Sequence, residues 1–565
     1  MGLLEDLLAR GYFPIQLPPA FSTSSFSTQL AQFIGQWPTG TPPNTSAEKY
    51  SVARSSYYRR TTALVNPIGF YFLAKEIATH WPQIDAHYKK TQISQSIPEI
   101  GIPTSLRAIE LQRFSALHEE KITRSSGYKY ALVTDVTSFF PAIYTHTIPW
   151  ALHTKAVAKG NKGKDKHRAQ LLGNILDVRC MGLQDGQTIG LPIGPDTSHI
   201  LAEIIAVAID LQLRSQLGSW PEGFRYVDDF FFFFTRREEA EKALAVITKA
   251  VSEFELYINP AKTRIIEVKE LAEESWKYRV KKLSIRPSRR QQRDDIHHFF
   301  ESLFSMEKAF ADESLVKYGL KRLTTTIIKK SNWPILESYL LKCGYSFPNT
   351  LQVIARLLST YNHYDYPINQ PAISRFCNDM IRTSAISNHH GEVSWLLWIC
   401  KEFGFALEAG LAAEIARMPS SVCRLLVLDL YHSQITPESL PDAILKPIAS
   451  EVTLTGSDWL LAYEAGRREW LHNTNDRFIQ SHPYFGPMLA ADVQFYNEDT
   501  KLLPLFQFTT PQKPDGDFDF DFDTDQQIDE SFEFEDADEE YSDSGRSDDS
   551  AESEEDTDDT EPVDF

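Results

Sequence analysis

The stretch RYVDDFFFFF, from Arg225 to Phe234, sets two adjacent carboxylates against five consecutive phenylalanines. It predicts a β-hairpin whose turn carries Asp228 and Asp229. Like charges side by side in a tight turn repel each other, so the arrangement favours a neighbouring cation, usually a divalent metal. The alternative is a solvated turn, because aspartate is common in turns. A turn clamped between apolar strands is rigid, however, and would hold both carboxylates in place.

A third carboxylate follows an apolar strand earlier in the chain. In ALVTDVTSFFPAI, from Ala131 to Ile143, Asp135 ends the strand-like run and lies 93 positions before Asp228. If the two acid-bearing strands pair side by side, these carboxylates come together. Two metal ions about 3.5–4 Å apart could then stabilise the attacking and leaving oxygens of an in-line phosphoryl transfer.

Strand and helix patterns alternate around these acids between residues 131 and 270, which predicts an α+β sheet domain. The clearest patterns are strands at 129–140 and 224–234 and helices at 198–217 and 237–256. From about residue 294 to 470, Leu, Ile and Trp recur at three- and four-residue spacing. This second pattern predicts short helices stacked as in an α-repeat, although it has no strict period.

The chain has 565 residues, which is too long for one ordinary core and predicts two or three domains. Its formal net charge of −20 is concentrated at one end, since residues 515–565 hold 25 acidic residues and one basic residue, Arg546. The rest of the chain has 56 basic and 52 acidic residues, a net charge of about +4. We expect the acidic end to be disordered, and local basic patches on the body to hold nucleic acid.

Composition also bears on location. The cysteines form no CxxC pair, which predicts a reducing, cytoplasmic setting and no zinc site; they are Cys180, Cys343, Cys377, Cys400 and Cys423. No apolar run approaches the ~20 residues that a membrane helix needs, so no membrane partner is expected. The opening sequence MGLLEDLLARGYFP has an early acid and no basic region, so no signal peptide is expected.

Four motifs occur in the order and spacing of a reverse transcriptase palm, and the set resembles that family. They are DVTSFFPAI (135–143), GQTIGLPIGPDTSHILAEI (186–204), YVDD (226–229) and LYINPAKT (256–263). Two more stretches, LVNPIGFYFLAKEI (64–77) and HHGEVSWLLWICKEFG (389–404), are similar to the prokaryotic abortive-infection and defence-associated subgroup. The resemblance implies four regions: fingers (1–130), palm (131–275), a basic thumb-like strip with an α-helical repeat domain (276–500), and a disordered acidic tail (501–565).

The resemblance also implies roles for individual residues. Asp135, Asp228 and Asp229 would be the catalytic carboxylates. Together with Val136 they would hold two Mg²⁺ ions, with Mn²⁺ as an alternative. Lys262 matches the lysine that protonates the leaving pyrophosphate, and its alternative is an exposed lysine after a turn.

Substrate contacts are implied in the same way. Phe140 matches the aromatic gate that crowds a ribose 2′-hydroxyl, with core packing as the alternative. Arg59 and Arg60 would hold the triphosphate, or would form a general nucleic-acid face beside the neighbouring tyrosines. Pro192 and Gly194, in the turn LPIGP, would also contact substrate.

One feature sets this chain apart from the wider family. Ile193 stands where many of these polymerases carry glutamine, and isoleucine cannot donate a hydrogen bond near the nucleotide and template. Some relatives in the defence-associated subgroup make DNA without a conventional template or from a protein tyrosine.

After the palm motifs, residues 277–293 carry eight basic residues and no acid, which predicts either a strip that binds a nucleic-acid backbone or a solvated linker.

Together these features predict a reverse transcriptase-type DNA polymerase that adds dNTPs in antiviral defence and is template-independent or protein-primed. Two alternatives stay open: a retron- or intron-type enzyme that copies a cognate noncoding RNA, and a nucleic-acid-binding module with an inactive palm. The expected partners are dNTPs, single-stranded nucleic acid including a noncoding RNA, and further copies of the chain through the helical domain.

Overall fold

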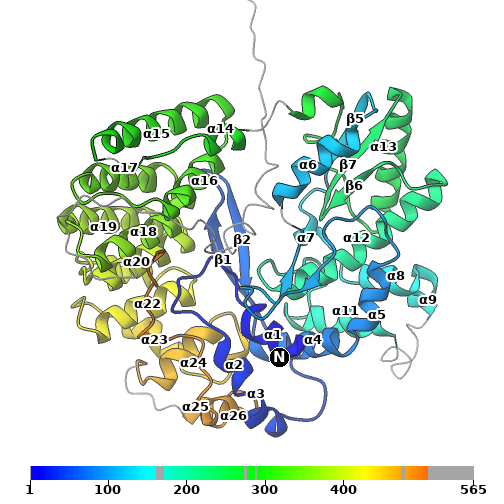
Figure 1. The fold of residues 1–565 in the computed structure, drawn as a ribbon. Helices are drawn as coiled ribbons and strands as arrows, with labels where there is room; N and C mark the ends of the chain where they lie inside the picture. The colour runs from blue at the N-terminus through cyan, green and yellow to red at the C-terminus, as the bar shows by residue number, and fades with distance from the viewer. Residues whose placement is uncertain are drawn as a thin grey trace, which may run out of the picture.

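The computed structural model describes residues 2–112, 114–160, 171–272, 276–286, 289–471 and 477–506. Of the predicted acidic tail, only residues 501–506 fall within these ranges. Figure 1 shows two lobes on either side of a long hairpin, β1–β2: a sheet lobe built from α4 to β8 and a helical lobe from α14 onward. Among the described helices, none is both long and apolar enough to cross a bilayer.

The first part of the chain forms the base of the molecule and the long hairpin. β1 (Glu48–Ala53) and β2 (Arg59–Leu64) pair antiparallel, with Val52 opposite Arg60. The other elements of this part are α1 (Leu3–Arg10), α2 (Ser24–Thr28), α3 (Leu30–Phe33), η1 (Ile34–Gln36), α4 (Pro67–Thr79), α5 (Trp81–Tyr88), β3 (Glu99–Ile100), β4 (Ile109–Glu110) and α6 (Phe114–Ser125).

A four-stranded antiparallel sheet in the order β6–β7–β5–β8 forms the centre of the sheet lobe. Its strands are β5 (Tyr130–Thr134), β6 (Gly223–Tyr226), β7 (Asp229–Phe234) and β8 (Arg264–Glu267). The accompanying helices are α7 (Phe139–Ala142), α8 (Thr147–His153), α9 (Lys155–Gly160), α11 (Leu172–Gly182), α12 (Asp196–Leu217), α13 (Arg237–Ser252) and η2 (Val268–Ala272). The predicted α+β architecture is confirmed.

Both faces of the phenylalanine strand β7 are covered, which explains why so apolar a run is tolerated. Phe231 lies opposite Phe224 on β6, and the ammonium of Lys121 on α6 lies 4.3 Å from the centre of the Phe231 ring. Phe230 lies opposite Arg225, whose side chain reaches α12 on the other face of the sheet. The four residues Phe230 to Phe233 are at most 2% exposed.

The elements predicted around these strands occur with shifted ends. The predicted helix at 198–217 is α12, and it ends where Gly218 takes a left-handed φ of 84°, a conformation that glycine adopts without steric cost. The predicted strand at 129–140 is shorter than expected, because β5 ends at Thr134. Ser138 then turns the chain with a φ of 47°, and Phe139 and Phe140 begin the short helix α7.

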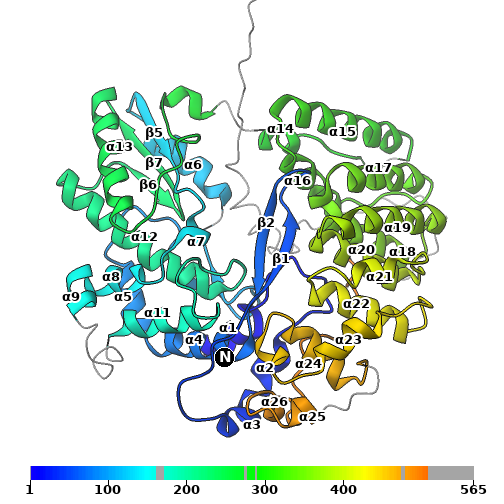
Figure 2. The ribbon, with the colours of Figure 1, turned by 180° about the vertical axis from the view of Figure 1, so that it is seen from behind.

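The helical lobe is a stack of antiparallel helices, seen on the left in Figure 1 and on the right in Figure 2. One face of the helix at 390–403 is fully buried, since Val393, Leu396, Leu397 and Cys400 are each 0% exposed. The elements are α14 (Lys277–Lys281), α15 (Arg289–Phe310), α16 (Ser314–Arg322), η3 (Leu323–Thr325), α17 (Trp333–Ser346), η4 (Pro348–Thr350), α18 (Leu351–His363), α19 (Gln370–Ile386), α20 (His390–Phe403), α21 (Leu411–Ile415), α22 (Ser421–His432), α23 (Asp442–Ile448), η5 (Thr453–Thr455), α24 (Trp459–Arg467), α25 (Arg477–Gln480) and α26 (Phe485–Ala490).

The long hairpin leans on the helical lobe through buried polar contacts. The Tyr50 hydroxyl lies 2.5 Å from the Ser394 hydroxyl on α20. The backbone N–H of Ser421 at the start of α22 donates to Glu48 Oε1 at 2.8 Å, and Glu48 is only 2% exposed. Burial raises the pKa of Glu48 to about 8, so this carboxyl is held largely neutral at pH 7.

The beginning and the end of the described chain also pack together, as both views show at the base of the molecule. Phe21 forms an antiparallel bridge with Tyr496, and their rings lie 5.0 Å apart. The indole N–H of Trp37 donates to the Tyr484 carbonyl at 3.0 Å. The helical lobe therefore closes over the N-terminal segment.

Candidate active site

The turn between β6 and β7 contains only two residues, Val227 and Asp228, because Tyr226 pairs directly with Asp229. Val227 has a φ of 51°. Two-residue hairpin turns favour glycine in this left-handed conformation, and a β-branched side chain there costs about 1–2 kcal/mol. Such strain persists only where the surroundings enforce the backbone, and it is common at functional sites.

Two hydrogen bonds fix this strained residue. The Ser96 hydroxyl accepts from Val227 N–H at 2.8 Å, and the Arg225 guanidinium donates to the Val227 carbonyl at 2.9 Å. Both partners are buried, with Arg225 at 0% and Ser96 at 2% exposure. The turn that presents the two aspartates is therefore anchored from beneath.

Arg225 is the centre of a buried ion cluster with α12. Its guanidinium donates to Asp210 through two bonds of 2.9 Å and to Glu203 through bonds of 2.8 and 3.0 Å. Burial by itself would lower the pKa of Arg225, but the two carboxylates raise it above its ordinary value. The guanidinium stays charged, and the edge strand β6 is locked to α12.

Asp135 lies beside the turn across the sheet. β5 and β7 pair with Val133 opposite Phe231 and Thr134 opposite Phe230, which is the last pair of the ladder. Asp135 follows Thr134 and Asp229 precedes Phe230, so both lie next to this last pair. Asp135 is 5% exposed, and among the described residues its Oδ1 atom is buried without a hydrogen-bond partner. A buried anionic oxygen in this state is costly unless a cation joins it.

Lys262 reaches Asp135 from the segment before β8. Its ammonium lies 3.0 Å from Asp135 Oδ2. The segment is aligned by Asn259, whose N–H donates to the Asp135 carbonyl at 2.8 Å, and by a 2.7 Å bond between the Thr134 and Thr263 hydroxyls. The structure thus brings Asp135, Asp229 and Lys262 to one corner of the sheet.

The described residues contain no group of three or more His, Cys, Asp or Glu side chains arranged to hold a metal ion. Val136, one of the predicted ligands, is 2% exposed and bridges Ile258, so only its carbonyl oxygen could face an ion. Lys262 supplies the positive charge next to Asp135 in this arrangement. The metal assignment of Asp135, Val136, Asp228 and Asp229 therefore stays a prediction.

The turn LPIGP joins the long hairpin to α12. Ala63 N–H on β2 donates to the Ile193 carbonyl at 2.8 Å, and the Ser198 hydroxyl donates to the Pro192 carbonyl at 2.6 Å. Gly194 has a φ of 125°, and a Cβ there would lie 2.8 Å from Pro14 Cγ, so glycine is required by both conformation and space.

Phe140 and Phe139 differ in their surroundings. Phe139 is 4% exposed and belongs to the core, whereas Phe140 is partly exposed and packs edge-on against the ring of His199 at 5.0 Å. Phe140 is the second residue of α7, the helix that follows the loop with Asp135. Its position is compatible with the predicted gate, and the gate stays a prediction.

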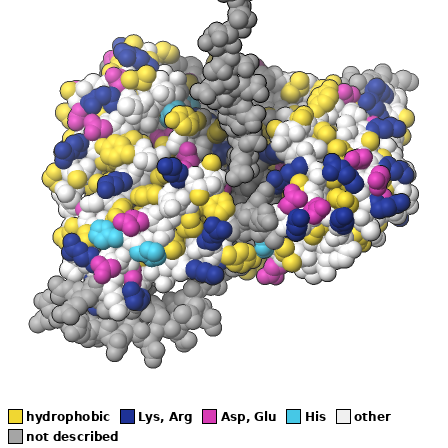
Figure 3. Space-filling model, turned by 90° about the horizontal axis from the view of Figure 1, so that it is seen from above, with side chains coloured by type: hydrophobic (Ala, Val, Ile, Leu, Met, Phe, Trp, Pro, Cys, Tyr) yellow, Lys and Arg dark blue, Asp and Glu magenta, His cyan; other side chains and the backbone are white. Residues whose placement is uncertain are grey.

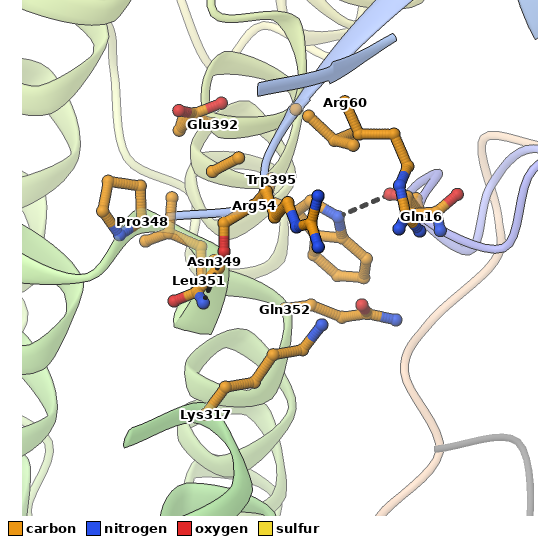
Figure 4. A pocket seen from close by; sticks show the side chains of 13 residues that line it. Gln16, Arg54, Arg60, Lys317, Pro348, Asn349, Leu351, Gln352, Glu392 and Trp395 are labelled. Carbon is orange, nitrogen blue, oxygen red and sulfur yellow. Dashed lines mark hydrogen bonds between the residues drawn. The ribbon is translucent and has the colours of Figure 1, made fainter. Parts of the chain in front are cut away.

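The two predicted triphosphate arginines lie elsewhere, on the long hairpin. Arg59 forms a two-bond ion pair with Glu392 on α20, at 2.5 and 2.7 Å. Arg60 lines a pocket between the hairpin and the helical lobe, shown in Figure 4. Glu392 lies 333 positions from Arg59 in sequence, so the local pattern did not predict this ion pair. The triphosphate role of Arg59 and Arg60 stays a prediction.

Sequence reasoning also missed the buried cluster of Arg225, Glu203 and Asp210. A signal was present, because Glu203 and Asp210 lie seven positions apart in an otherwise apolar stretch of α12. Seven residues are two helical turns, so both acids fall on one face. Buried acids on an apolar face imply a cationic partner, and Arg225 immediately precedes YVDD.

Comparison with known proteins agrees with this geometry. Residues 79–286 match the family described as reverse transcriptase (RNA-dependent DNA polymerase). This segment is a reverse transcriptase domain, and the match indicates a reverse transcriptase-like nucleotidyltransferase. It includes all four palm motifs and ends before most of the helical lobe. No curated protein matches the chain.

Two solved structures are similar to the chain at low identity. One is a telomerase from Candida albicans in complex with a TWJ fragment of telomeric RNA, with 11% identity and a TM-score of 0.28; the similarity covers 72% of this chain and 66%, just under two thirds, of that one. The other is an apo telomerase from Candida tropicalis, with 11% identity, a TM-score of 0.29 and coverage of 82% of this chain and 75% of that one.

Proposed function

We propose that the chain is a DNA polymerase of the reverse transcriptase type that adds dNTPs to a growing strand at the corner of the sheet where Asp135, Asp229 and Lys262 meet. The observation that carries the proposal is that Asp135 and Asp229 both adjoin the last pair of the β5–β7 ladder beside an anchored turn, with a lysine ammonium 3.0 Å from Asp135. Acids fixed in this way suit phosphoryl transfer, which depends on positioning and charge stabilisation.

Reverse transcriptases use divalent metal ions, and carboxylate oxygens are the ligands that Mg²⁺ prefers. The observation in favour is Asp135 Oδ1, a hard, anionic oxygen that is buried without a hydrogen bond from the described residues. Asp135, Asp228, Asp229 and the Val136 carbonyl would hold Mg²⁺. The bound ions would stabilise the negative charge that develops on the phosphoryl oxygens.

Lys262 would change partner during the reaction. Without substrate, its ammonium balances Asp135. A nucleotide triphosphate brings more negative charge to the same corner, so the ammonium can turn to the leaving pyrophosphate and donate a proton to it. Lys262 is about one quarter exposed, which leaves the side chain room to move.

The remaining roles follow the geometry of the turn and of α7. Phe140 would meet the sugar of the incoming nucleotide and exclude a 2′-hydroxyl. Pro192 and Gly194 would shape the floor beneath it, and Ile193 would meet the nucleotide without donating a hydrogen bond. Synthesis that is template-independent or begins on a protein tyrosine is the finer proposal that Ile193 supports, and a role in antiviral defence accompanies the motif resemblance.

A second candidate is a retron- or intron-type enzyme that copies a cognate noncoding RNA. It is favoured by the family match to RNA-dependent polymerases and disfavoured by Ile193. A binding module without activity is disfavoured because Asp135, Asp228 and Asp229 are all present.

Incorporation of labelled dNTPs by the purified chain, with Mg²⁺ or with EDTA, tests the proposal. We expect metal-dependent incorporation that Asp228→Asn/Asp229→Asn abolishes without lowering the melting temperature. Residual incorporation near the wild-type rate would contradict the site. Sequencing the product with and without co-purified RNA distinguishes copying from template-free synthesis.

A further inference from the structure

The tip of the long hairpin exposes two adjacent aromatic rings. Tyr57 is 90% exposed and Tyr58 is 65% exposed. Tyrosine offers a flat apolar ring with a polar tip, which suits a binding surface that is wet when empty. Neither ring packs in the core, so both rings are available to contact a ligand outside the chain.

The backbone of this tip is anchored to the helical lobe. Ser56 donates from its N–H and its hydroxyl to Glu313 at 2.7 and 2.9 Å, and its hydroxyl lies 2.8 Å from the Ser346 carbonyl. Asn349 donates to the Arg54 carbonyl at 3.1 Å. The rings are therefore presented from a fixed support, which lowers the entropy lost when a ligand binds.

Beside the tip, a pocket between the hairpin and the helical lobe gathers three basic side chains. Arg54, Arg60 and Lys317 line it together with Trp395. Figure 4 shows these basic side chains entering the pocket from the hairpin and from α16. Arg60 lies opposite Val52 in the hairpin, and Val52 contacts Gly391 of α20, so Arg60 is on the hairpin face that meets the helical lobe.

The charge of this pocket is positive among its lining residues. Glu392 is the acid in the lining, and it is bound through two bonds by Arg59 from the hairpin. The side-chain amides of Gln16, Asn349 and Gln352 add hydrogen-bonding groups. Figure 3 shows Lys and Arg spread over both lobes among acidic side chains, so charge alone does not mark this place. The place is marked by the combination of three converging basic side chains and two exposed rings.

We propose that the hairpin tip and this pocket bind single-stranded nucleic acid, with Tyr57 and Tyr58 stacking on unpaired bases and Arg54, Arg60 and Lys317 holding backbone phosphates. A single strand offers both groups that the site can recognise, negative phosphates and accessible base faces. A duplex hides its base faces, and a free phosphate has none. The proposal rests on the proposed polymerase function, since it names where that enzyme holds an unpaired strand.

Binding of a fluorescein-labelled dT 20-mer to the full chain, measured by anisotropy in EDTA, tests the site without depending on polymerase activity. Tyr57→Ser/Tyr58→Ser should weaken binding roughly 10- to 100-fold, because one to two base stacks are lost. Tyr57→Phe/Tyr58→Phe should bind within threefold of wild type, because phenylalanine keeps both rings. A 20-base-pair duplex should bind more weakly and should not respond to the tyrosine changes.

The basic side chains of the site are tested separately, through the salt dependence of binding. Arg54→Gln/Arg60→Gln should weaken binding and reduce the slope of log affinity against log salt by about 1.4, at ~0.7 per lost phosphate contact. Arg237→Gln on α13, an exposed arginine paired with Glu241, is the matched control and should leave the slope unchanged. Iodouracil in place of thymine should crosslink to the peptide that contains Tyr57 and Tyr58.

Three results would overturn the inference. The serine variant could bind as wild type does, with crosslinks mapping to the 277–293 strip. Pyrophosphate could displace the strand while the tyrosine variants have no effect, which would leave a phosphate site only. Finally, the tyrosine variants could change the particle mass measured by light scattering without changing the affinity for the strand, which would show that the tip contacts protein. Loss of dNTP incorporation with intact binding would instead count against the proposed polymerase function alone.

Discussion

Replacing Arg225 should destabilise the sheet lobe and misplace the turn that carries the two aspartates. The guanidinium is 0% exposed and makes four bonds of 2.8–3.0 Å to Asp210 and Glu203. Arg225→Met leaves both carboxylates buried without this cation. Removing one partner of a buried ion pair costs about 3–5 kcal/mol, which is a large part of the 5–15 kcal/mol that stabilises a typical domain.

A compensated variant separates stability from positioning. In Arg225→Met/Glu203→Gln/Asp210→Asn, the carboxylate charges are gone as well, so the free energy of unfolding should recover by about half or more. The Val227 carbonyl still lacks its 2.9 Å donor, so the strained turn should relax and dNTP incorporation should stay at least 10-fold below wild type.

The assay pairs urea unfolding, followed by far-UV circular dichroism, with single-nucleotide incorporation across a range of Mg²⁺ concentrations. Mispositioned aspartates should raise the Mg²⁺ concentration needed for half-maximal rate as well as lower kcat. An Arg225→Met variant that loses less than about 1 kcal/mol would refute the stability reasoning. A compensated variant with wild-type incorporation would refute the positioning role.

Three more predictions concern the sugar, the pH and the two lobes. Phe140→Ala should lower discrimination between dNTPs and rNTPs by roughly one to three decades, and an unchanged ratio of incorporation rates would place this ring in the core only. The pKa of Glu48 is raised to about 8, so its contribution to stability is present below about pH 4.5 and is lost as the pH rises through 8. The melting temperature of the wild type should therefore fall more between pH 6 and 9 than that of Glu48→Gln. Parallel curves of melting temperature against pH would contradict this. A fragment of residues 1–300 should be poorly soluble, because it lacks the helices that cover the N-terminal segment, and a soluble, fully active fragment would show that the lobes are independent.

The acids of the site were predictable because their signals are local. Asp135 follows an apolar strand, Asp228 and Asp229 lie in the turn and at the start of another, and the antiparallel pairing of the two strands brings these ends together. Lys262 belongs to the short motif LYINPAKT, whose backbone pairs with Asp135 and the residue after it. The alternation of apolar residues in the strands and the residue types in the turns are sufficient to predict such features.

The omissions come from partners that are distant in sequence. Arg59 pairs with Glu392, whose approach depends on how the helical lobe stacks, and its role at a triphosphate stays a prediction. The helical lobe contacts the long hairpin and the N-terminal segment, and a pattern of apolar spacing cannot show which surface covers which.

The closure of the N-terminal segment by the last helices has a consequence for synthesis. Residues 12–37 leave the ribosome long before Tyr484 and Tyr496, yet the surface that shelters Trp37 and Phe21 includes these two tyrosines. Contacts between such distant parts of a chain form slowly and only after their loop-closure cost is met. Every prematurely terminated product that stops before this point therefore keeps an exposed aromatic surface, which is the kind of surface that quality-control chaperones and proteases detect. The packing of these two distant segments therefore shields that surface only after the helical lobe has been synthesised.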